Sequence, residues 1–221
     1  MPFSARVFQV LIASPSDVTE EREIAVRTIQ EWNDLNSAER KVVLLPIRWE
    51  THSSPEYGNA PQEVLNRQIV DRSDLLVGIF WTRIGTPTGA ADSGTLEEIA
   101  RVAAQGKPVM LYFSRAMQDP DRIDLEQLAK LRDFKAKTCN KALIETFSSQ
   151  NEFRELLAKH LEFKVRSLAL KKAKALKRTQ SRQVKTAGLI RLDSIRTRPL
   201  DKGAPNEKTN CCSTHDFIPR S

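Results

Sequence analysis

Short apolar runs alternate with amphipathic stretches along the first 165 residues of the chain. The apolar runs are brief and rich in β-branched residues, which predicts buried strands; they are VFQVLI (7–12), KVVLLPI (41–47), DLLVGIF (74–80), PVMLYF (108–113) and ALIET (142–146). Helical spacing of apolar residues predicts helices after these runs, over residues 17–35, 61–71, 95–105, 121–137 and 149–170. The pattern therefore predicts strands and helices in strict alternation.

Such an alternation predicts an α/β fold, a five-stranded doubly wound parallel sheet with helices on both faces and right-handed crossovers. Pro46 within the second run lacks a backbone donor, which favours a strand at the edge of the sheet. The third run is the most continuously apolar, which favours the centre. We predict a flavodoxin-like strand order of 2-1-3-4-5, with the topological switch between strands one and three.

Local signals place the ends of several of these elements. Asp17, followed by Glu20, is the acidic analogue of a capping box and predicts that the first helix begins there. The buried stripe of that helix is predicted to be Val18, Ile24, Ala25, Ile29 and Trp32. Gly106 is a suitable residue to end the helix over 95–105. Residues 50–60 are polar and are predicted to form a loop.

The positive charge of the chain is confined to its C-terminal part. The formal net charge is +7, but residues 1–170 carry −2 and residues 171–221 carry +9. We predict an α/β domain over 1–165 and a basic extension over 166–221, first helical and then, past about residue 180, disordered because it holds too little apolar area to fold. The extension begins with the basic residues Lys171, Lys172, Lys174, Lys177 and Arg178.

This basic extension admits two interpretations. Clustered lysines and arginines favour weak binding of nucleic acid. Alternatively, the extension is a solvated tail or the remnant of a lost partner domain. The sequence does not choose between them.

Apolar run length and cysteine spacing indicate the cellular location of the protein and whether it holds disulfides or a metal. The sequence has no apolar run long enough to span a bilayer, and Met1-Pro2-Phe3-Ser4 lacks the features of a signal peptide, so we expect a cytoplasmic protein without membrane contact. Cys139, Cys211 and Cys212 match neither a disulfide framework nor a metal-ligand spacing. We expect free thiols and no metal site.

We expect the loops after the first and third strands to meet at the switch point, because ligands of doubly wound sheets bind outside the carboxyl ends of the strands. The first of these loops is Ser14-Pro15-Ser16-Asp17. Its hydroxyls and free helix amides suit a phosphate or a ribose hydroxyl. The alternative is that Ser16 and Asp17 only cap the following helix.

The second segment follows the third strand and reads Trp81-Thr82-Arg83-Ile84-Gly85. Trp81 offers an aromatic surface for a base, and Arg83 offers a cation for a phosphate or carboxylate. The alternative is that Trp81 packs over the end of the sheet and that Arg83 is solvated.

The third segment, Asp92-Ser93-Gly94-Thr95-Leu96-Glu97-Glu98, follows a glycine-rich loop. It places Glu98 at the start of the helix over 95–105, at the mouth of the sheet, where its carboxylate is a candidate catalytic group. The alternative is that Thr95 and Glu98 form a capping box, in which the glutamate returns to the Thr95 amide. Glu97 is expected to point elsewhere.

Two resemblances bear on this third segment. Residues 91–113, ADSGTLEEIARVAAQGKPVMLYF, resemble the nucleoside 2-deoxyribosyltransferase motif, a D-x-G-T-x-x-E stretch before a helix that ends in G-K-P-V. Glu98 falls on the nucleophile position of that family and Asp92 on a sugar-binding carboxylate. VLIASPSDVTEEREIA (10–25) and SDLLVGIFWTRIGTP (73–87) look like domain of unknown function 4062 (DUF4062), a TIR-like relative of bacterial multidomain proteins.

Both resemblances imply N-glycosidic chemistry at Glu98. TIR domains share the flavodoxin-like order, and active ones cleave the nicotinamide–ribose bond of NAD with a glutamate at the corresponding helix. The resemblance thus implies a nucleotide N-glycosidase, an NAD glycohydrolase or a nucleoside deoxyribosyltransferase-like enzyme, in bacterial stress or antiphage signalling. NAD would be its substrate, and it would need no cofactor. Trp81 would stack the base, Asp92 would hold ribose hydroxyls, and the loop over 14–17 would hold phosphate or sugar.

A different class of function is also compatible with these residues. Many TIR-like domains are inactive, so the chain could be a signalling module that assembles as a homo-oligomer through its helices, or one that recognises a nucleotide without cleaving it. A nucleotide found bound and unaltered would favour this second interpretation.

Overall fold

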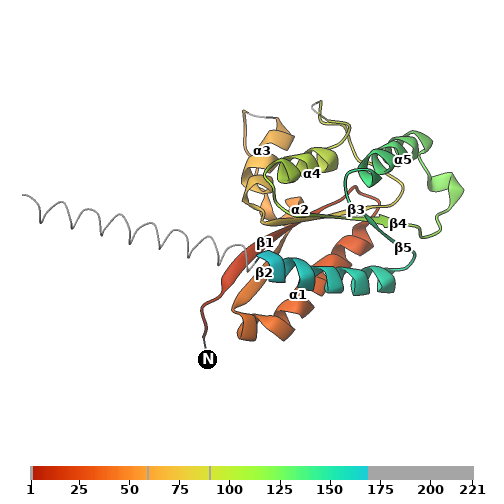
Figure 1. The fold of residues 1–221 in the computed structure, drawn as a ribbon. Helices are drawn as coiled ribbons and strands as arrows, with labels where there is room; N and C mark the ends of the chain where they lie inside the picture. Colours follow the sequence, from red (N-terminus) through yellow and green to blue (C-terminus); the bar gives the residue numbers. More distant parts are fainter. Residues whose placement is uncertain (1, 59, 90, 169–221) are drawn as a thin grey trace, which may run out of the picture. The chain divides into compact units, whose positions relative to one another are not determined.

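Five parallel strands form the central sheet of the computed structural model, which describes residues 2–168 apart from 59 and 90 (Figure 1). The sheet order is β2-β1-β3-β4-β5, as predicted. The strands are β1 (Arg6–Ala13), β2 (Val42–Ile47), β3 (Leu75–Phe80), β4 (Val109–Ser114) and β5 (Glu145–Phe147). Every neighbouring pair is parallel. The predicted flavodoxin-like α/β fold is therefore confirmed.

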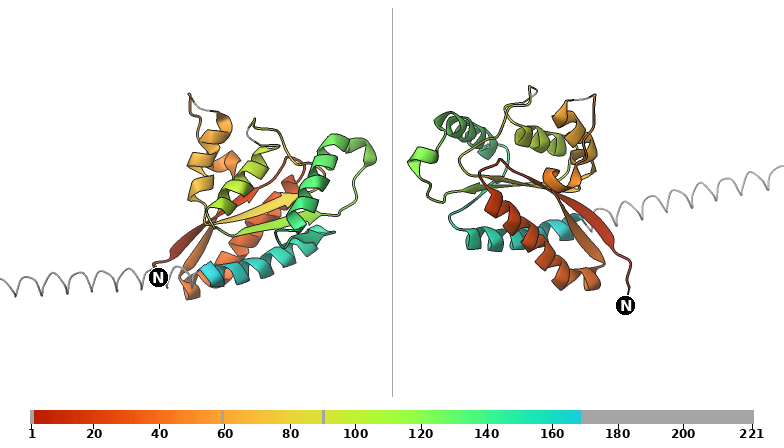
Figure 2. Two further views of the ribbon diagram at one scale, coloured as in Figure 1. Left: turned by 45° about the horizontal axis from the view of Figure 1, so that its top comes forward. Right: turned by 180° about the vertical axis from the view of Figure 1, so that it is seen from behind.

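Helices cover both faces of this sheet (Figure 2). One face is covered by α1 (Thr19–Arg40) and a C-terminal helix over residues 150–168; the other is covered by α3 (Pro61–Gln68), α4 (Gly94–Ala104) and α5 (Leu125–Cys139). Three short helical segments complete the described part of the chain: α2 (Trp49–His52), η1 (Val70–Arg72) and η2 (Pro120–Arg122).

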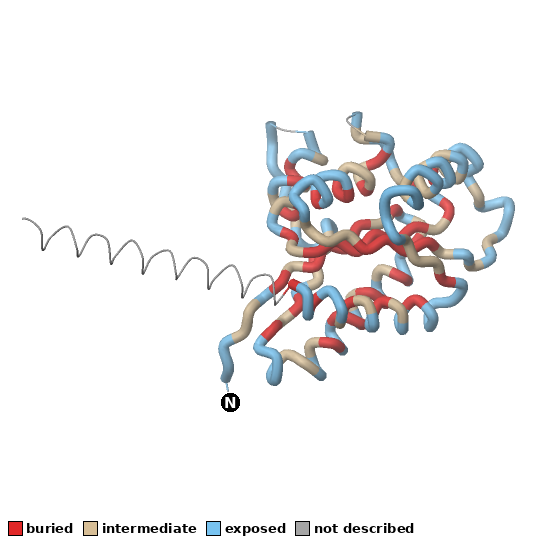
Figure 3. The backbone as a smooth tube through the Cα atoms, in the orientation of Figure 1, coloured by how far each residue is buried: buried red, intermediate tan, exposed pale blue. Residues whose placement is uncertain are grey.

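The core lies on both sides of the central strands, whose residues are buried in Figure 3. Strand β1 alternates between the two faces: Phe8, Val10 and Ile12 pack against α1 and the C-terminal helix, and Leu11 and Ala13 pack under α3 and α4. All six residues of β3 are buried. A continuous apolar run is the expected sequence of a strand that is covered on both faces.

The predicted edge position of the second strand is also confirmed. Strand β2 pairs with β1 alone, and Pro46 lies opposite Val10 in that register. An edge strand tolerates proline because a missing donor on its outer side removes no ladder hydrogen bond. All five residues of the stripe predicted for α1 are buried. They are Val18, the N-cap residue, and Ile24, Ala25, Ile29 and Trp32 within the helix.

Several predicted boundaries were wrong. Helix α1 continues to Arg40, five residues beyond the predicted end, and closes with Lys41 in the left-handed region at φ 55°. The polar stretch predicted as a loop, residues 50–60, begins with the last three residues of α2, and the predicted helix over 61–71 is divided into α3 and η1. Polar composition alone does not distinguish a short exposed helix from a loop.

Capping explains where α5 and β5 begin. The Asp124 carboxylate accepts hydrogen bonds from the backbone amides of Glu126 and Gln127, both at 3.1 Å, so α5 begins at Leu125 and not at residue 121. At the other end of α5, the amides of Lys141 and Ala142 both donate to the Thr138 carbonyl. Lys141 and Ala142 therefore belong to the turn that ends α5. As a result, β5 begins at Glu145, three residues after the predicted start at residue 142.

The C-terminal helix packs on the core past residue 165, where the sequence predicts the end of the α/β domain. Val165 and Leu168, on the C-terminal helix, are both buried against the core. The core therefore extends at least to residue 168. The predicted disorder past residue 180, the basic cluster over 171–178, and Cys211 and Cys212 lie outside the described residues.

Neither a membrane-spanning helix nor a metal cluster is found in the described part of the chain. None of its helices combines the length and apolarity that crossing a bilayer requires. Across residues 2–168, with the two gaps, no group of three or more His, Cys, Asp or Glu side chains is arranged to hold a metal ion. Cys139 is a free, exposed thiol.

Gly78 allows α4 to pack closely on the sheet, and we predict that Gly78→Ala is destabilising. A Cβ atom at this position would lie 2.7 Å from Cδ2 of Leu111 and 3.4 Å from Cδ1 of Ile99. Both neighbours are buried, so overpacking should lower the free energy of unfolding by about 1–3 kcal/mol. Chemical denaturation measures this, and adding Leu111→Val should restore part of the loss. A Gly78→Ala protein as stable as the wild type would contradict the prediction.

Candidate functional site

A cavity of about 660 Å³ opens at the carboxyl ends of β1 and β3, and we call it the β1–β3 cavity. Its walls are the loop after β1, the loop after β3 and residues near the starts of α1, α2, α3, α4 and α5. The helices that follow β1 and β3 lie on opposite faces of the sheet. The cavity therefore occupies the predicted topological switch point, where such folds bind ligands.

Glu98 lines this cavity from the buried face of α4. It is 9% exposed and shares that face with Thr95, Ile99 and Val102, at the spacing that places residues on one side of a helix. A buried carboxylate is rare unless it is paired or has a function. Among the described residues, Glu98 takes part in no salt bridge.

Burial raises the pKa of Glu98 to about 7. The main cause is loss of hydration of the charged form, and the negative charges of Glu97 and Glu50 raise the pKa further. A hydrogen bond with the Gln62 side chain acts in the opposite direction. A carboxyl group that changes its protonation state near neutral pH beside an open cavity is a candidate for acid–base or electrostatic catalysis.

The alternative interpretation of Glu98 as a helix cap is wrong. Helix α4 is capped by Ser93, whose hydroxyl accepts a hydrogen bond from the Leu96 amide at 3.1 Å. The residue three positions after this cap is Leu96, so no capping box forms with Thr95 and Glu98. Thr95 is instead a buried residue of the first turn, and it lines the cavity together with Gly94.

Glu97 has a structural role, as its predicted direction suggested. Its Oε1 accepts a hydrogen bond from Asn66 Nδ2 at 2.6 Å, and its Oε2 accepts one from Thr88 Oγ1 at 2.7 Å. These contacts join α3, the loop after β3 and α4. Of the two adjacent glutamates, Glu98 alone lines the β1–β3 cavity.

Gly94 lets α3 approach the first turn of α4. A Cβ atom at residue 94 would lie 2.6 Å from Oε1 of Gln62. Gln62 lines the cavity, hydrogen-bonds Glu98, and also donates from Nε2 to Asn66 Oδ1 at 3.3 Å. The glycine predicted as a site residue therefore acts by leaving room for the amide that contacts the buried carboxyl group.

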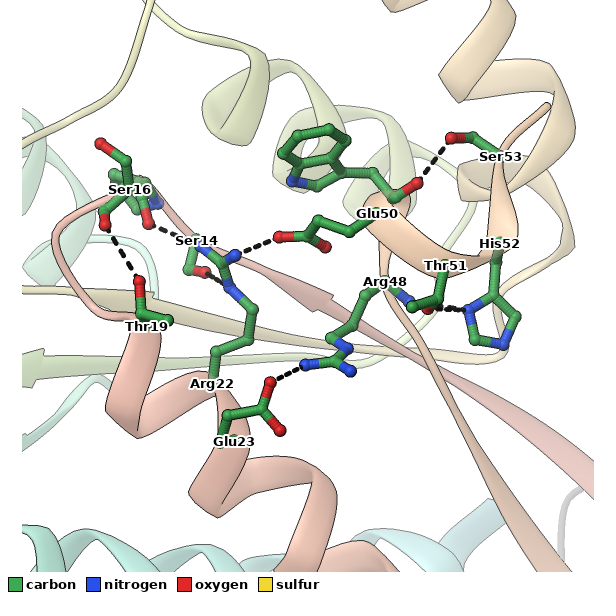
Figure 4. Close-up of polar contacts among 12 residues, drawn as sticks. Ser14, Ser16, Thr19, Arg22, Glu23, Arg48, Glu50, Thr51, His52 and Ser53 are labelled. Atoms are coloured by element: carbon green, nitrogen blue, oxygen red, sulfur yellow. Dashed lines mark hydrogen bonds and ion pairs between the residues drawn. The ribbon is translucent and has the colours of Figure 1, made fainter. Parts of the chain in front are cut away.

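Arg22 connects the loop after β1 to α2 (Figure 4). Its Nε donates to Ser14 Oγ at 2.9 Å, and its Nη2 donates to the Pro15 carbonyl at 2.9 Å. Its Nη1 forms a salt bridge with Glu50. Because the Arg22 side chain is 11% exposed and lines the cavity, a largely buried cation contributes to the wall.

The loop after β3 is held at its turn by α5. The Oε1 atom of Gln127 accepts hydrogen bonds from the amides of Ile84 and Gly85, at 3.2 and 3.1 Å. Gly85, Gln127 and the exposed Arg83 all line the cavity. The first turn of α5, which the sequence analysis did not connect with the site, therefore positions the predicted site residue Gly85 and its neighbour Ile84.

The structure brings most of the predicted site residues together. Those that line the β1–β3 cavity are Ser14, Pro15, Ser16, Arg83, Gly85, Gly94, Thr95 and Glu98. Asp17, Trp81 and Asp92 do not line it, and each is a correction to the predicted set.

Asp17 bridges the two central loops instead of facing the cavity or capping α1. Its Oδ2 accepts hydrogen bonds from the amide and hydroxyl of Thr82, both at 2.9 Å, and from the Arg83 amide at 3.0 Å. Within the described residues, α1 has no side-chain cap, and its N-cap residue is Val18. Two backbone amides and one hydroxyl group of the loop after β3 thus share a single carboxylate oxygen of the loop after β1.

Trp81 lies in the wall of a second cavity, of about 480 Å³, together with Asp17, Glu21 and Phe147. Its indole Nε1 donates to the Ala116 carbonyl at 2.9 Å, and its ring packs against the core on the α1 side. The alternative interpretation, in which Trp81 packs over the end of the sheet, is the one that agrees with this placement. Asp92 is exposed and lines neither cavity.

Sequence reasoning missed Arg22, Trp49, Gln62 and Gln127, which also line the β1–β3 cavity. A signal existed for Arg22: it falls four residues after Val18 and three before Ala25, so a cation occupies the buried stripe of α1. Trp49 is 51% exposed, and the sequence analysis assigned it to no element, because it lies between the second apolar run and the predicted loop over 50–60. Gln62 and Gln127 depend on contacts between distant elements.

The sequence matches the protein family described as "Domain of unknown function (DUF4062)" over residues 9–162. This match confirms the DUF4062 resemblance and leaves the nucleoside 2-deoxyribosyltransferase resemblance a prediction. No curated protein matches the chain.

Solved structures show only distant similarity. A conserved protein from Enterococcus faecalis V583 is 16% identical, with a TM-score of 0.39, over 70% of this chain and 99% of that one. The translation elongation factor SelB from Methanococcus maripaludis, apo form, is 10% identical, with a TM-score of 0.41 over 76% of this chain and 36% of that one. Era from Aquifex aeolicus bound to GDP·AlF4− is 13% identical, with a TM-score of 0.37 over 71% and 56%. Similarity at this level carries no argument about function.

The bridge made by Asp17 leads to a prediction about stability. Asp17→Ala removes the acceptor of the two loop amides and the Thr82 hydroxyl. Leaving these donors without an acceptor should lower the free energy of unfolding by about 1–3 kcal/mol. Chemical denaturation measures the change. The matched control is Ser16→Ala in the same loop, where an exposed side chain is shortened and a change within about 0.5 kcal/mol is expected. Equal effects of the two substitutions would argue against the bridge.

The raised pKa of Glu98 predicts that this residue destabilises the folded protein at alkaline pH. A folded-state pKa of about 7, against 4.5 for an unperturbed glutamate, means that stability present below pH 4.5 is lost as the pH rises through about 7. Glu98→Gln should therefore be more stable than the wild type at pH 8, by up to about 3 kcal/mol. The difference should be small at pH 4.5. Denaturation at both pH values tests this, and a difference that does not depend on pH would contradict it.

Proposed function

We propose that this chain, which belongs to the DUF4062 family, binds a nucleotide in the β1–β3 cavity and cleaves its N-glycosidic bond. We further propose that NAD is the substrate and that Glu98 is the catalytic carboxylate. The observation that carries the proposal is a buried carboxyl group with a pKa of about 7 in the wall of an open cavity of about 660 Å³. Cavities of roughly 300–1,000 Å³ are typical of small-molecule sites.

The chemistry of N-glycoside cleavage explains why a carboxylate would be needed there. When the bond between ribose C1′ and nicotinamide breaks, its electron pair leaves with the base, and positive charge develops on the ribose. An ionised Glu98 next to C1′ would stabilise that charge or add to C1′. Water then supplies the hydroxyl group at C1′ and releases a proton, so the products are ADP-ribose and nicotinamide.

Burial favours this use of Glu98. A carboxylate in a site with little water interacts more strongly with a developing positive charge than a hydrated one does. A positively charged nicotinamide ribose next to Glu98 would also lower its pKa and favour the ionised form. The energetic cost of burying the group in the free protein would thus be partly recovered in the transition state.

Other residues of the cavity suit the remaining parts of a nucleotide. Trp49 is 51% exposed at the cavity and offers an aromatic face to a base, the part predicted from sequence for Trp81. The hydroxyl groups of Ser14 and Ser16 lie in the opposite loop and suit ribose hydroxyls. Arg83, exposed at the cavity, suits a phosphate.

We expect the purified 221-residue chain to release nicotinamide from NAD, and we expect Glu98→Gln to reduce kcat/KM at least 100-fold. The amide keeps the shape of the side chain but cannot carry the negative charge, and single groups that stabilise a transition-state charge contribute about 100-fold or more. Chromatography of nicotinamide and ADP-ribose gives the rates. The wild-type kcat/KM should rise with pH through about 7, as Glu98 ionises.

A matched control is Glu155→Gln, an equivalent change at an exposed position of the C-terminal helix, which should retain wild-type turnover. Turnover by Glu98→Gln equal to that of the wild type would remove Glu98 from the mechanism. Deoxynucleosides tested in parallel separate a deoxyribosyltransferase-like enzyme from an NAD glycohydrolase. NAD that binds but remains intact would instead favour a nucleotide-sensing module.

A further inference from the structure

Arg22 occupies an unusual position for a cation. It lies on the buried stripe of α1, its side chain is 11% exposed, and it lines the β1–β3 cavity. Two of its hydrogen bonds, to Ser14 Oγ and to the Pro15 carbonyl, fix the guanidinium against the loop after β1. Burying a charge destabilises a protein unless a group of opposite charge pairs with it. The role of Arg22 therefore depends on which group pairs with it.

The partner of Arg22 is Glu50, a residue of the short helix α2 (Figure 4). The Glu50 side chain is 30% exposed, and it is not part of the cavity wall. Its negative charge is nevertheless close enough to raise the pKa of Glu98. Glu50 therefore approaches the guanidinium from the rim of the cavity.

The guanidinium has donors beyond those used in this arrangement. It carries five N–H groups in a planar fork. Within the described part of the chain, one bond each from Nε, Nη1 and Nη2 accounts for three of them. A planar, always-charged fork in a cavity wall is the arrangement that binds phosphate or carboxylate oxygens. Arg83, the second cation of the same wall, adds to the positive potential.

Helix α2, which carries Glu50, is weakly anchored to the rest of the domain. It has only four residues, none of which is buried. A second salt bridge, between Arg48 and Glu23, joins the residue before α2 to α1 outside the cavity (Figure 4). Two ion pairs therefore join this segment to α1, and it has no buried side chain to hold it in place.

We propose that Arg22 is a phosphate-binding group of the β1–β3 cavity, in addition to Arg83, and that Glu50 is its internal competitor, which pairs with Arg22 while no anion is bound. Binding of a phosphate group then replaces the Glu50 carboxylate at the guanidinium and frees α2, which also carries Trp49. The assignment of the anion to a nucleotide rests on the proposed function. Anion binding by Arg22 does not, because it depends on the guanidinium and its contacts alone.

Inorganic pyrophosphate is the probe, and its affinity for the 221-residue chain is measured by isothermal titration calorimetry at constant ionic strength. Arg22→Gln should weaken binding about tenfold or more, because a charge-assisted pair of hydrogen bonds is lost. Glu50→Gln should strengthen binding about three- to tenfold, because the competing charge is removed. The opposite signs of the two effects distinguish competition from general damage to the site.

Glu23→Gln is the matched control for Glu50→Gln. It breaks the other ion pair of the α2 segment but leaves the partner of Arg22 in place. We expect it to change pyrophosphate affinity less than twofold. Equal strengthening by Glu23→Gln and Glu50→Gln would overturn the role of Glu50 as a competitor, since loosening of α2 would then explain both.

The Glu50→Gln variant keeps the proposal testable even if Arg22→Gln fails to fold. Undetectable pyrophosphate binding by both the wild type and Glu50→Gln would overturn the anion site, whatever the outcome with NAD. Conversely, a protein that binds pyrophosphate through Arg22 but leaves NAD intact would retain the anion site and lose the proposed glycosidase activity.

Discussion

The parallel pairing of β1 with β3 fixes where the cavity forms and which loops surround it. Ala13, the last residue of β1, lies opposite Gly78, and β3 continues to Phe80. After these strands the chain leaves toward opposite faces of the sheet. The two departing loops cannot fill the space between them, so a cavity forms at their meeting point. Asp17 fixes the spacing of the loops through its three hydrogen bonds to Thr82 and Arg83.

Charge is distributed around this cavity in a way that opposes stability. Glu98 is buried with a raised pKa, and Arg22 is nearly buried with a partner from a short, exposed helix. Both arrangements are less favourable for folding than apolar side chains would be. Such groups are expected at functional sites, where a strained or poorly hydrated group in the free protein is stabilised by a ligand or a transition state.

The two glutamates of α4 show how position on one helix separates structure from chemistry. Glu97 has both carboxylate oxygens satisfied by Asn66 and Thr88, and it holds α3 and the loop after β3 in place. Glu98, one residue later, lines the cavity. It hydrogen-bonds Gln62, and the negative charges of Glu97 and Glu50 act on it. Gly94 makes this possible by admitting Gln62 close to the helix start.

Hydrophobic periodicity and the chirality of crossovers were enough to predict the strand order, the edge position of β2, the buried stripe of α1 and the switch point at which the β1–β3 cavity lies. Glu98 was predicted as a catalytic candidate from its place at the start of the helix over 95–105 and from the family resemblance, and that role stays a prediction. Three features became known from the folded chain alone: Asp17 bridges two loops, Trp81 faces another cavity, and Arg22 pairs with Glu50. Each joins residues that are distant in the chain, and local pattern contains no information about which of several suitable partners a polar side chain will meet. The Ser93 cap of α4 is a local contact, and the sequence pattern missed it because the nearby Thr95 offers a second hydroxyl for the same role.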